Sequence, residues 1–134
     1  MTGDSGAATE TGAGTRRVLV VEDEVLIGML LEDMLGDLGF QVFAMASNID
    51  QAKELARDAP VDLAILDVNL NGQEVFPVAE ILAGRGIPFL FATGYGERGL
   101  PPAFQNRPTL QKPFHQESLE RQVTTLFPSG TATI

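Results

Sequence analysis

The chain has 134 residues, enough for one domain, and its formal net charge is −9. The acidic balance, without a basic patch, argues against binding to nucleic acid or to an anionic membrane, and the absence of Cys with a single His excludes disulfides, thiolate nucleophiles, Cys-zinc sites and multi-His metal sites. No apolar run approaches the ~18 residues that span a bilayer and no signal-peptide pattern is present, so we expect a soluble, cytoplasmic domain.

The two ends of the chain differ in composition from the middle. Residues 1–15 are mostly Gly, Ala, Thr and Ser and contain no large apolar side chain after Met1, so we predict that they are disordered. Residues 128–134 resemble a short tail. The folded domain is therefore predicted to cover residues 16–127, with no internal repeat and no second domain.

Short β-branched runs alternate with segments of helical apolar spacing in the first half of this domain. The predicted elements are a strand at Arg17–Val21, a helix at Glu24–Leu38 ending before Gly39, a strand at Phe40–Ala46, a helix capped by Ser47 and running to Asp58, and a strand at Val61–Leu66. The inward face of the first helix is predicted to hold Ile27, Leu30, Leu31, Met34, Leu35 and Leu38.

The second half continues the alternation. Its predicted elements are a helix at Gln73–Ala83 with Pro77 in the first turn, a strand at Pro88–Ala92, a short strand at Thr109–Gln111 and a helix at His115–Phe127. Five strands alternating with helices predict an α/β fold built of βαβ units, with a parallel sheet and right-handed crossovers. The segment Gly94–Pro108 is rich in Gly and Pro, so we expect its helix, the fourth, to be short or mobile.

Polar side chains follow four of the predicted strands. Glu22 and Asp23 follow the first strand and Asp67 follows the third, while Thr93 and Lys112 follow the last two. Because ligands of open α/β sheets bind at the carboxyl ends of the strands, we expect these groups to converge. Three adjacent carboxylates need a counter-charge, and Mg²⁺ suits a site of few carboxylates that also binds phosphate. A carboxylate, a hydroxyl, a cation and a metal are the groups that phosphoryl transfer uses.

The sequence resembles a response-regulator receiver domain. The motifs that carry the resemblance are VLVVEDE (Val18–Glu24), LAILDVNL (Leu63–Leu70), FATG (Phe91–Gly94) and LQKPF (Leu110–Phe114), in the order that the family has. The resemblance implies a flavodoxin-like (βα)5 three-layer sandwich with strand order 2-1-3-4-5. It further implies a phosphoprotein that takes part in two-component signal transduction.

The resemblance also implies a role for each residue of the pocket. Asp67 is expected to be the phosphoacceptor, and Mg²⁺ to be held by Asp23, Asp67, the backbone carbonyl of Asn69 and, through water, Glu22. Thr93 is expected to bond the phosphoryl oxygen, and Lys112 to bond Asp67 or the phosphoryl group. The Lys112–Pro113 peptide is expected to be cis. The Asn69 side chain is a candidate for tuning dephosphorylation.

One feature departs from the general pattern of receivers. They carry an aromatic switch residue shortly before the lysine, where this chain has Thr109, Leu110 and Gln111. The run PFLFATGYG (Pro88–Gly96) instead resembles the FATGUY subfamily, which lacks that aromatic. This resemblance implies an alphaproteobacterial regulator of stress or light responses that pairs with an HWE-type histidine kinase.

Several other residues carry weaker expectations. Tyr95, the only Tyr, is expected to cover the core rather than to replace the missing aromatic, and His115 to be a surface or capping residue. Four phenylalanines are predicted to be core residues: Phe40, Phe43, Phe76 and Phe89.

We therefore expect a stand-alone, monomeric receiver that is phosphorylated by a histidine kinase or a phosphotransferase and is not itself an enzyme in the usual sense. It would act as an adaptor for an unidentified downstream protein, or as a phosphate sink or shuttle. The alternative is a pseudo-receiver that binds partners without phosphorylation. An aspartate-based phosphatase is disfavoured because Asn69 stands where a second Asp is needed. A flavodoxin-like flavin carrier is disfavoured because Glu22, Asp23 and Glu24 would repel the phosphate.

Overall fold

The computed structural model describes residues 15–94 and 100–127. The predictions of a disordered segment at residues 1–15 and of a tail at 128–134 concern residues outside this part, except for Thr15. The prediction for Tyr95 also lies outside it. In the described ranges, no helix is both long enough and apolar enough to cross a membrane.

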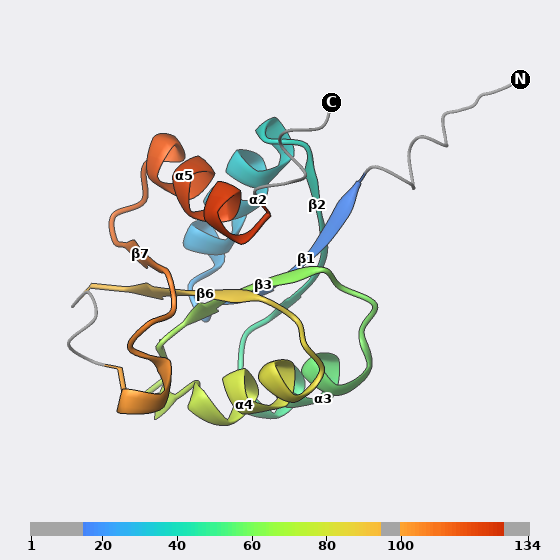
Figure 1. Cartoon of the computed structure of the whole chain (residues 1–134), viewed down its shortest axis with the longest axis vertical. Coiled ribbons are helices and arrows are strands. Elements are labelled where there is room, and N and C mark those ends of the chain that lie inside the picture. Colours follow the sequence, from blue (N-terminus) through green and yellow to red (C-terminus); the bar gives the residue numbers. More distant parts are fainter. Residues whose placement is uncertain (1–14, 95–99, 128–134) are drawn as a thin grey trace, which may run out of the picture.

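A five-stranded parallel sheet forms the middle layer (Figure 1). Its strands are β1 (Arg16–Val21), β2 (Phe40–Ala46), β3 (Leu63–Asp67), β6 (Phe89–Thr93) and β7 (Thr109–Gln111). Their order is β2-β1-β3-β6-β7. Counted along the sheet alone this is the predicted order 2-1-3-4-5, so the flavodoxin-like fold class is confirmed.

Two helices cover each face of the sheet (Figure 1). On one face lie α2 (Val25–Asp37) and α5 (Gln116–Leu126), and on the other α3 (Ile49–Asp58) and α4 (Phe76–Gly84). Val18 and Val20 of β1 pack in the apolar cluster that includes Leu31 and Leu35, while Leu19 and Val21 pack in the other cluster. Because side chains alternate across a strand, both faces of β1 are buried, which explains its uninterrupted apolar sequence.

The predicted elements all exist, with small shifts at their ends. Asn48, not Ser47, caps α3, because its side-chain oxygen accepts a 2.8 Å hydrogen bond from the amide of Gln51. Strand β3 begins at Leu63, two residues later than predicted, and Asp62 just before it accepts a hydrogen bond from the amide of Arg17. Pro77 lies in the first turn of α4, as predicted.

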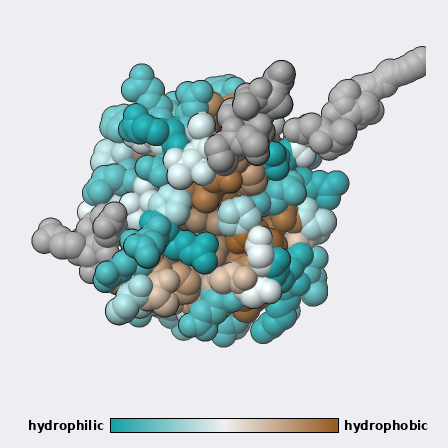
Figure 2. Space-filling view, in the orientation of Figure 1, coloured by the Kyte–Doolittle hydropathy of each residue, from teal (hydrophilic) through white to brown (hydrophobic). Residues whose placement is uncertain are grey.

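Two apolar side chains that were predicted to be core residues lie on the surface. Leu30 on α2 and Phe43 on the edge strand β2 are each 43% exposed. Helical spacing placed Leu30 inward, but the buried side of α2 is formed by Gly28, Leu31, Met34 and Leu35. Figure 2 shows that one face of the molecule is mostly hydrophilic with an apolar patch near its middle. Exposed apolar surface of this kind often marks interaction sites.

Two segments between strands have short regular structure. A hairpin that the sequence prediction missed, β4 (Asn69–Leu70) and β5 (Gln73–Glu74), follows β3, so α4 begins at Phe76 rather than at Gln73. In the predicted fourth-helix region, residues 100–108 contain one turn of 3-10 helix, η2 (Pro102–Phe104), and residues 95–99 lie outside the described part. Within the described residues of this region, regular structure is limited to that one turn, and the prediction for residues 95–99 lies outside the described part.

A cluster of aromatic side chains anchors that region. Phe104 of η2 lies 5.6–6.0 Å, between ring centroids, from three other phenylalanines. These are Phe76, Phe89 and Phe91. Arg107 lies over the ring of Phe89 at 4.4 Å. The cluster joins the connection between β6 and β7 to the core.

Candidate functional site

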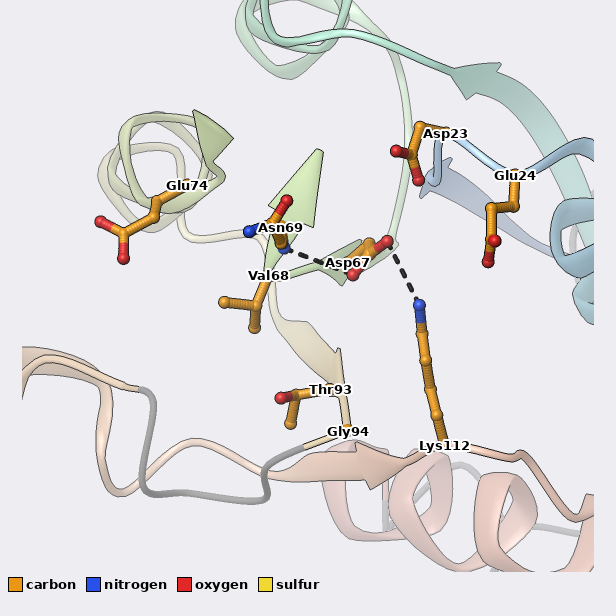
Figure 3. A pocket seen from close by; sticks show the side chains of 9 residues that line it. All are labelled: Asp23, Glu24, Asp67, Val68, Asn69, Glu74, Thr93, Gly94 and Lys112. Carbon is orange, nitrogen blue, oxygen red and sulfur yellow. Dashed lines mark hydrogen bonds and ion pairs between the residues drawn. The ribbon is translucent and has the colours of Figure 1, made fainter. Parts of the chain in front are cut away.

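The carboxyl ends of four strands surround a pocket of about 490 Å³ (Figure 3). Asp23 follows β1, Asp67 ends β3, Thr93 ends β6 and Lys112 follows β7, and all four side chains line it. Parallel strands bring their carboxyl ends to the same edge of a sheet, which is why residues far apart in sequence meet here. The structure therefore brings together the polar residues that the sequence analysis selected.

Three carboxyl groups form an acidic cluster at the pocket, and two of them, those of Asp23 and Asp67, line it. One carboxylate oxygen each from Glu22, Asp23 and Asp67 lies within 4.8 Å of the others. Glu22 and Asp67 are buried, at 6% and 7% exposure, and Asp23 is half-buried. Repulsion between carboxylates this close together disfavours ionisation of all three groups unless a cation compensates the charge.

Lys112 supplies one such cation. Its Nζ atom lies 3.2 Å from Oδ2 of Asp67 and 3.4 Å from Oε1 of Glu22. Burial alone would lower the pKa of the Lys112 ammonium, but the charges of Asp67 and Glu22 outweigh burial and raise it. The lysine therefore remains protonated at neutral pH and bridges two of the three carboxyl groups.

Glu22 is the most strongly perturbed group of the cluster. Burial, opposed by a hydrogen bond from the amide of Glu24 and reinforced by the charge of Asp67, raises the pKa of its carboxyl group to about 7. The Oε2 atom accepts that 3.1 Å hydrogen bond, whereas Oε1 has no hydrogen-bond partner and only the ion pair with Lys112. A further positively charged partner would stabilise this buried oxygen when the carboxyl group is ionised.

The donor set fits Mg²⁺. The acidic cluster offers the hard oxygen ligands that this ion prefers. The buried Glu22 Oε1 atom is the independent observation that a cation suits the site. The predicted roles of Asp23, Asp67 and the Asn69 carbonyl as ligands stay predictions.

The Asn69 side chain belongs to the hairpin. Its Oδ1 atom accepts a 2.8 Å hydrogen bond from the amide of Gly72, and its own amide lies 3.3 Å from Oδ1 of Asp67. In Figure 3 the side chain extends away from Asp67. The backbone of Asn69 thus contacts Asp67, whereas its side chain stabilises the turn.

Thr93 is buried at the end of β6, and the neighbouring strand β7 holds the backbone there. The amide of Lys112 donates to the carbonyl of Thr93 at 3.0 Å, and Nε2 of Gln111 donates to the carbonyl of Gly94 at 3.1 Å. The Lys112–Pro113 peptide is cis, as predicted. Gln111 at the end of β7 and Lys112 directly after it thereby hold the end of β6 that faces the pocket.

Sequence reasoning missed some residues of the site. Asn71 donates its amide to Oδ2 of Asp23 at 3.0 Å, and Glu24 and Glu74 also line the pocket. The dipeptide Asn71-Gly72 is a known signal for a tight hairpin and could have revealed the turn, although not its contact with Asp23. His115 is exposed at the start of α5 without a side-chain capping bond, and it does not line the pocket.

Residues 18–124 match the family of response regulator receiver domains. A transcriptional regulatory protein, PdtaR of Mycobacterium tuberculosis, is 35% identical over 98 residues, which are 72% of this chain and 48% of that protein. The chain thus matches about half the length of this relative.

Two solved structures are similar along most of their length. SdrG of Sphingomonas melonis Fr1 has a TM-score of 0.76 and 41% identity, covering 85% of this chain and 98% of the other. The receiver domain of the PhyR response regulator of Erythrobacter litoralis has a TM-score of 0.75 and 31% identity, covering 86% and 92%.

Proposed function

The chain belongs to the response regulator receiver domain family of two-component signalling, and we propose that it accepts a phosphoryl group on Asp67 from a phosphohistidine. The donor would be a histidine kinase or a phosphotransferase protein. The observation that carries the proposal is the position of Asp67, whose carboxylate lies in the pocket 3.2 Å from the Lys112 ammonium and within the acidic cluster. A carboxylate so placed is open to an incoming group and faces a cation that can offset new negative charge.

The transfer itself is simple chemistry at one oxygen. A carboxylate oxygen of Asp67 forms a bond to phosphorus while the bond from phosphorus to the histidine nitrogen breaks, and the imidazole leaves as a neutral ring when its other nitrogen carries a proton. Lys112 and the hydroxyl of Thr93 would bond the phosphoryl oxygens after transfer. The chain would assist its own phosphorylation and dephosphorylation without acting as an enzyme on another molecule.

Mg²⁺ would be held by Asp23, Asp67 and the backbone carbonyl of Asn69, with Glu22 acting through water. Bound there, it would supply positive charge beside the acceptor oxygen and the arriving phosphoryl group. The surrounding residues shape the pocket and its charge. Glu22 and Lys112 set the charge of the pocket, and the hairpin after β3 closes one side of it.

The donor protein would dock on α2. Four large apolar side chains on its first two turns, Val25, Leu26, Met29 and Leu30, are 43–79% exposed. Glu24, directly before this helix, lines the pocket, so the apolar surface starts at the pocket rim. A protein that delivers a phosphoryl group to Asp67 must cover this rim, and apolar burial would supply affinity.

The output would be a change of partner binding or of phosphate flow. A phosphoryl group on Asp67 would shift the equilibrium between two conformations of the surface formed by residues 100–108, β7 and α5. Lys112 and Thr93 join that surface to the pocket. The protein would work as an adaptor or as a phosphate sink or shuttle, in the cytoplasm and as a monomer.

We also propose the FATGUY assignment and, with it, an HWE-type kinase partner. The support is the run Pro88–Gly96 and the absence of an aromatic residue at Thr109 and Leu110. Solved PhyR structures, one of which is described as a stress response regulator, are among the similar proteins, which supports a role in stress responses.

The test is mass spectrometry after incubation with acetyl phosphate, with and without Mg²⁺, on the wild type and on Asp67→Ala. We expect a Mg²⁺-dependent gain of one phosphoryl group that the variant lacks. Because some receivers do not accept small donors, the same comparison is made with a phosphorylated HWE-type kinase. Failure with both donors would identify a pseudo-receiver that signals by binding alone.

A further inference from the structure

A two-residue turn joins β4 to β5 at the edge of the pocket. Leu70 pairs with Gln73, and the residues between them, Asn71 and Gly72, have φ values of 51° and 86°. Positive φ at both central positions is the signature of a type I′ turn, for which Asn-Gly is a preferred sequence. The turn therefore has a defined shape that these two residues maintain.

This turn contacts the ends of three strands. The main-chain amide of Asn71 donates to Oδ2 of Asp23 after β1 at 3.0 Å, and its side-chain amide lies 3.5 Å from the carbonyl of Ser47 after β2. The amide of Gly72 donates to the side chain of Asn69, which follows β3. A short hairpin thus extends from β3 across the end of β1.

The contact with Asp23 has an electrostatic consequence. Asp23 is half-buried beside Glu22 and Asp67, and repulsion among the carboxylates favours rotation of its side chain toward solvent. A hydrogen bond from an amide to a carboxylate is charge-assisted and directional. It fixes the Oδ2 atom of Asp23 and leaves the other oxygen for a second partner.

We propose that Asn71 is a positioning residue for the metal site: its main-chain amide holds Oδ2 of Asp23 so that Oδ1 stays available to Mg²⁺. The inference rests on the proposed function, which places Mg²⁺ on Asp23. The turn acts through Asp23 and does not itself bind the ion. Hydrogen-bond partners of metal ligands act in this way on affinity.

The test compares two glycine substitutions of the same kind in the full chain. Gly72 and Gly86 both have positive φ, 86° and 73°, and open space where a Cβ atom would stand. Gly72→Ala and Gly86→Ala therefore introduce similar backbone strain, one in the turn and one after α4. The melting temperature without metal is measured for both variants, together with the dissociation constant for Mg²⁺ by calorimetry.

We expect both variants to lose similar thermal stability, while only Gly72→Ala binds Mg²⁺ more weakly, by roughly tenfold. Equal Mg²⁺ affinity in the two variants and the wild type would overturn this inference and leave the proposed function intact. A wild type that binds no Mg²⁺ would overturn both.

A second measurement reads the hydrogen bond directly. Asn71 is exposed, so its amide exchanges with solvent slowly only if Asp23 protects it. By NMR, we expect the Asn71 amide to exchange faster in Asp23→Ala than in the wild type, while the Gly72 amide, bonded to Asn69, serves as the internal control. Equal exchange rates of the Asn71 amide in the two proteins would also overturn the inference.

Discussion

Lys112 reaches Asp67 across an intervening strand: its Nζ atom lies 3.2 Å from Oδ2, although β6 separates β7 from β3 in the sheet. The same ammonium lies 3.4 Å from Glu22 at the end of β1. One cation thus connects the ends of three strands at the pocket. A change of charge on Asp67 therefore acts directly on the position of Lys112 and on the strand that precedes it.

Removal of this cation is expected to destabilise the fold. Lys112→Met leaves Glu22 and Asp67 buried without their common partner, and we expect the free energy of unfolding to fall by about 2 kcal/mol. Urea denaturation without metal measures it. Lys53→Met on α3, which changes the only other lysine of the chain, is the control and should have little effect. An equal loss in the two variants would contradict the bridging role.

The pKa of Glu22 predicts how stability depends on pH. Because its pKa is raised from 4.5 to about 7 in the folded protein, the folded state binds more protons than the unfolded state between these values. The free energy of unfolding should therefore fall as pH rises from about 4.5 to about 7. Glu22→Gln should flatten this slope. Urea denaturation at several pH values without metal measures how the free energy of unfolding depends on pH. An unchanged slope in the variant would assign the effect to another group.

Mg²⁺ should raise thermal stability by relieving repulsion within the acidic cluster. At a concentration a hundredfold above the dissociation constant, a ligand that binds only the folded state adds about 2.7 kcal/mol. The melting temperature should rise with Mg²⁺ in the wild type and much less in Asp23→Asn. Because protonation of Glu22 opposes the cation, the effect should grow as pH rises through about 7. An unchanged melting temperature at saturating Mg²⁺ would contradict the site.

Much of this arrangement follows from local sequence. Buried strands such as Val18–Val21 have apolar residues on both faces, and the acidic residues that follow a parallel strand must lie at its carboxyl end. The parallel sheet and the meeting of Glu22, Asp67 and Lys112 could therefore be predicted, whereas the strand order came from the family resemblance. The family resemblance supplied the expected role of each residue.

The remaining features depend on contacts that periodicity does not encode. The 3.6-residue spacing allowed Leu30 to face either side of α2, and packing of Leu31 and Leu35 on the sheet decided it. Phe43 lies on an edge strand, where one face has less cover. The contact of Asn71 with Asp23 joins residues 48 positions apart, so only the folded chain shows it.

The aromatic cluster predicts that Phe104 holds the connection between β6 and β7. Phe104 is buried against Phe76, Phe89 and Phe91. Phe104→Ala should lower the free energy of unfolding by about 3 kcal/mol, as large-to-small changes in a core do. Phe43→Ala, at an exposed phenylalanine, should cost far less. Urea denaturation compares the two variants, and similar losses would show that Phe104 does not anchor the segment.

The exposed apolar surface of α2 predicts separate behaviour toward protein and small phosphodonors. Met29→Glu places a charge where a docking protein would bury an apolar side chain, so transfer from a phosphorylated kinase should slow by roughly tenfold or more. Acetyl phosphate needs no docking surface and should phosphorylate this variant as fast as the wild type.

The control Phe43→Glu changes an exposed apolar residue on β2, away from the pocket, and should leave both reactions unchanged. Equal slowing with both donors would mean that Met29→Glu disturbs the pocket itself, and normal transfer from the kinase would show that the donor docks elsewhere.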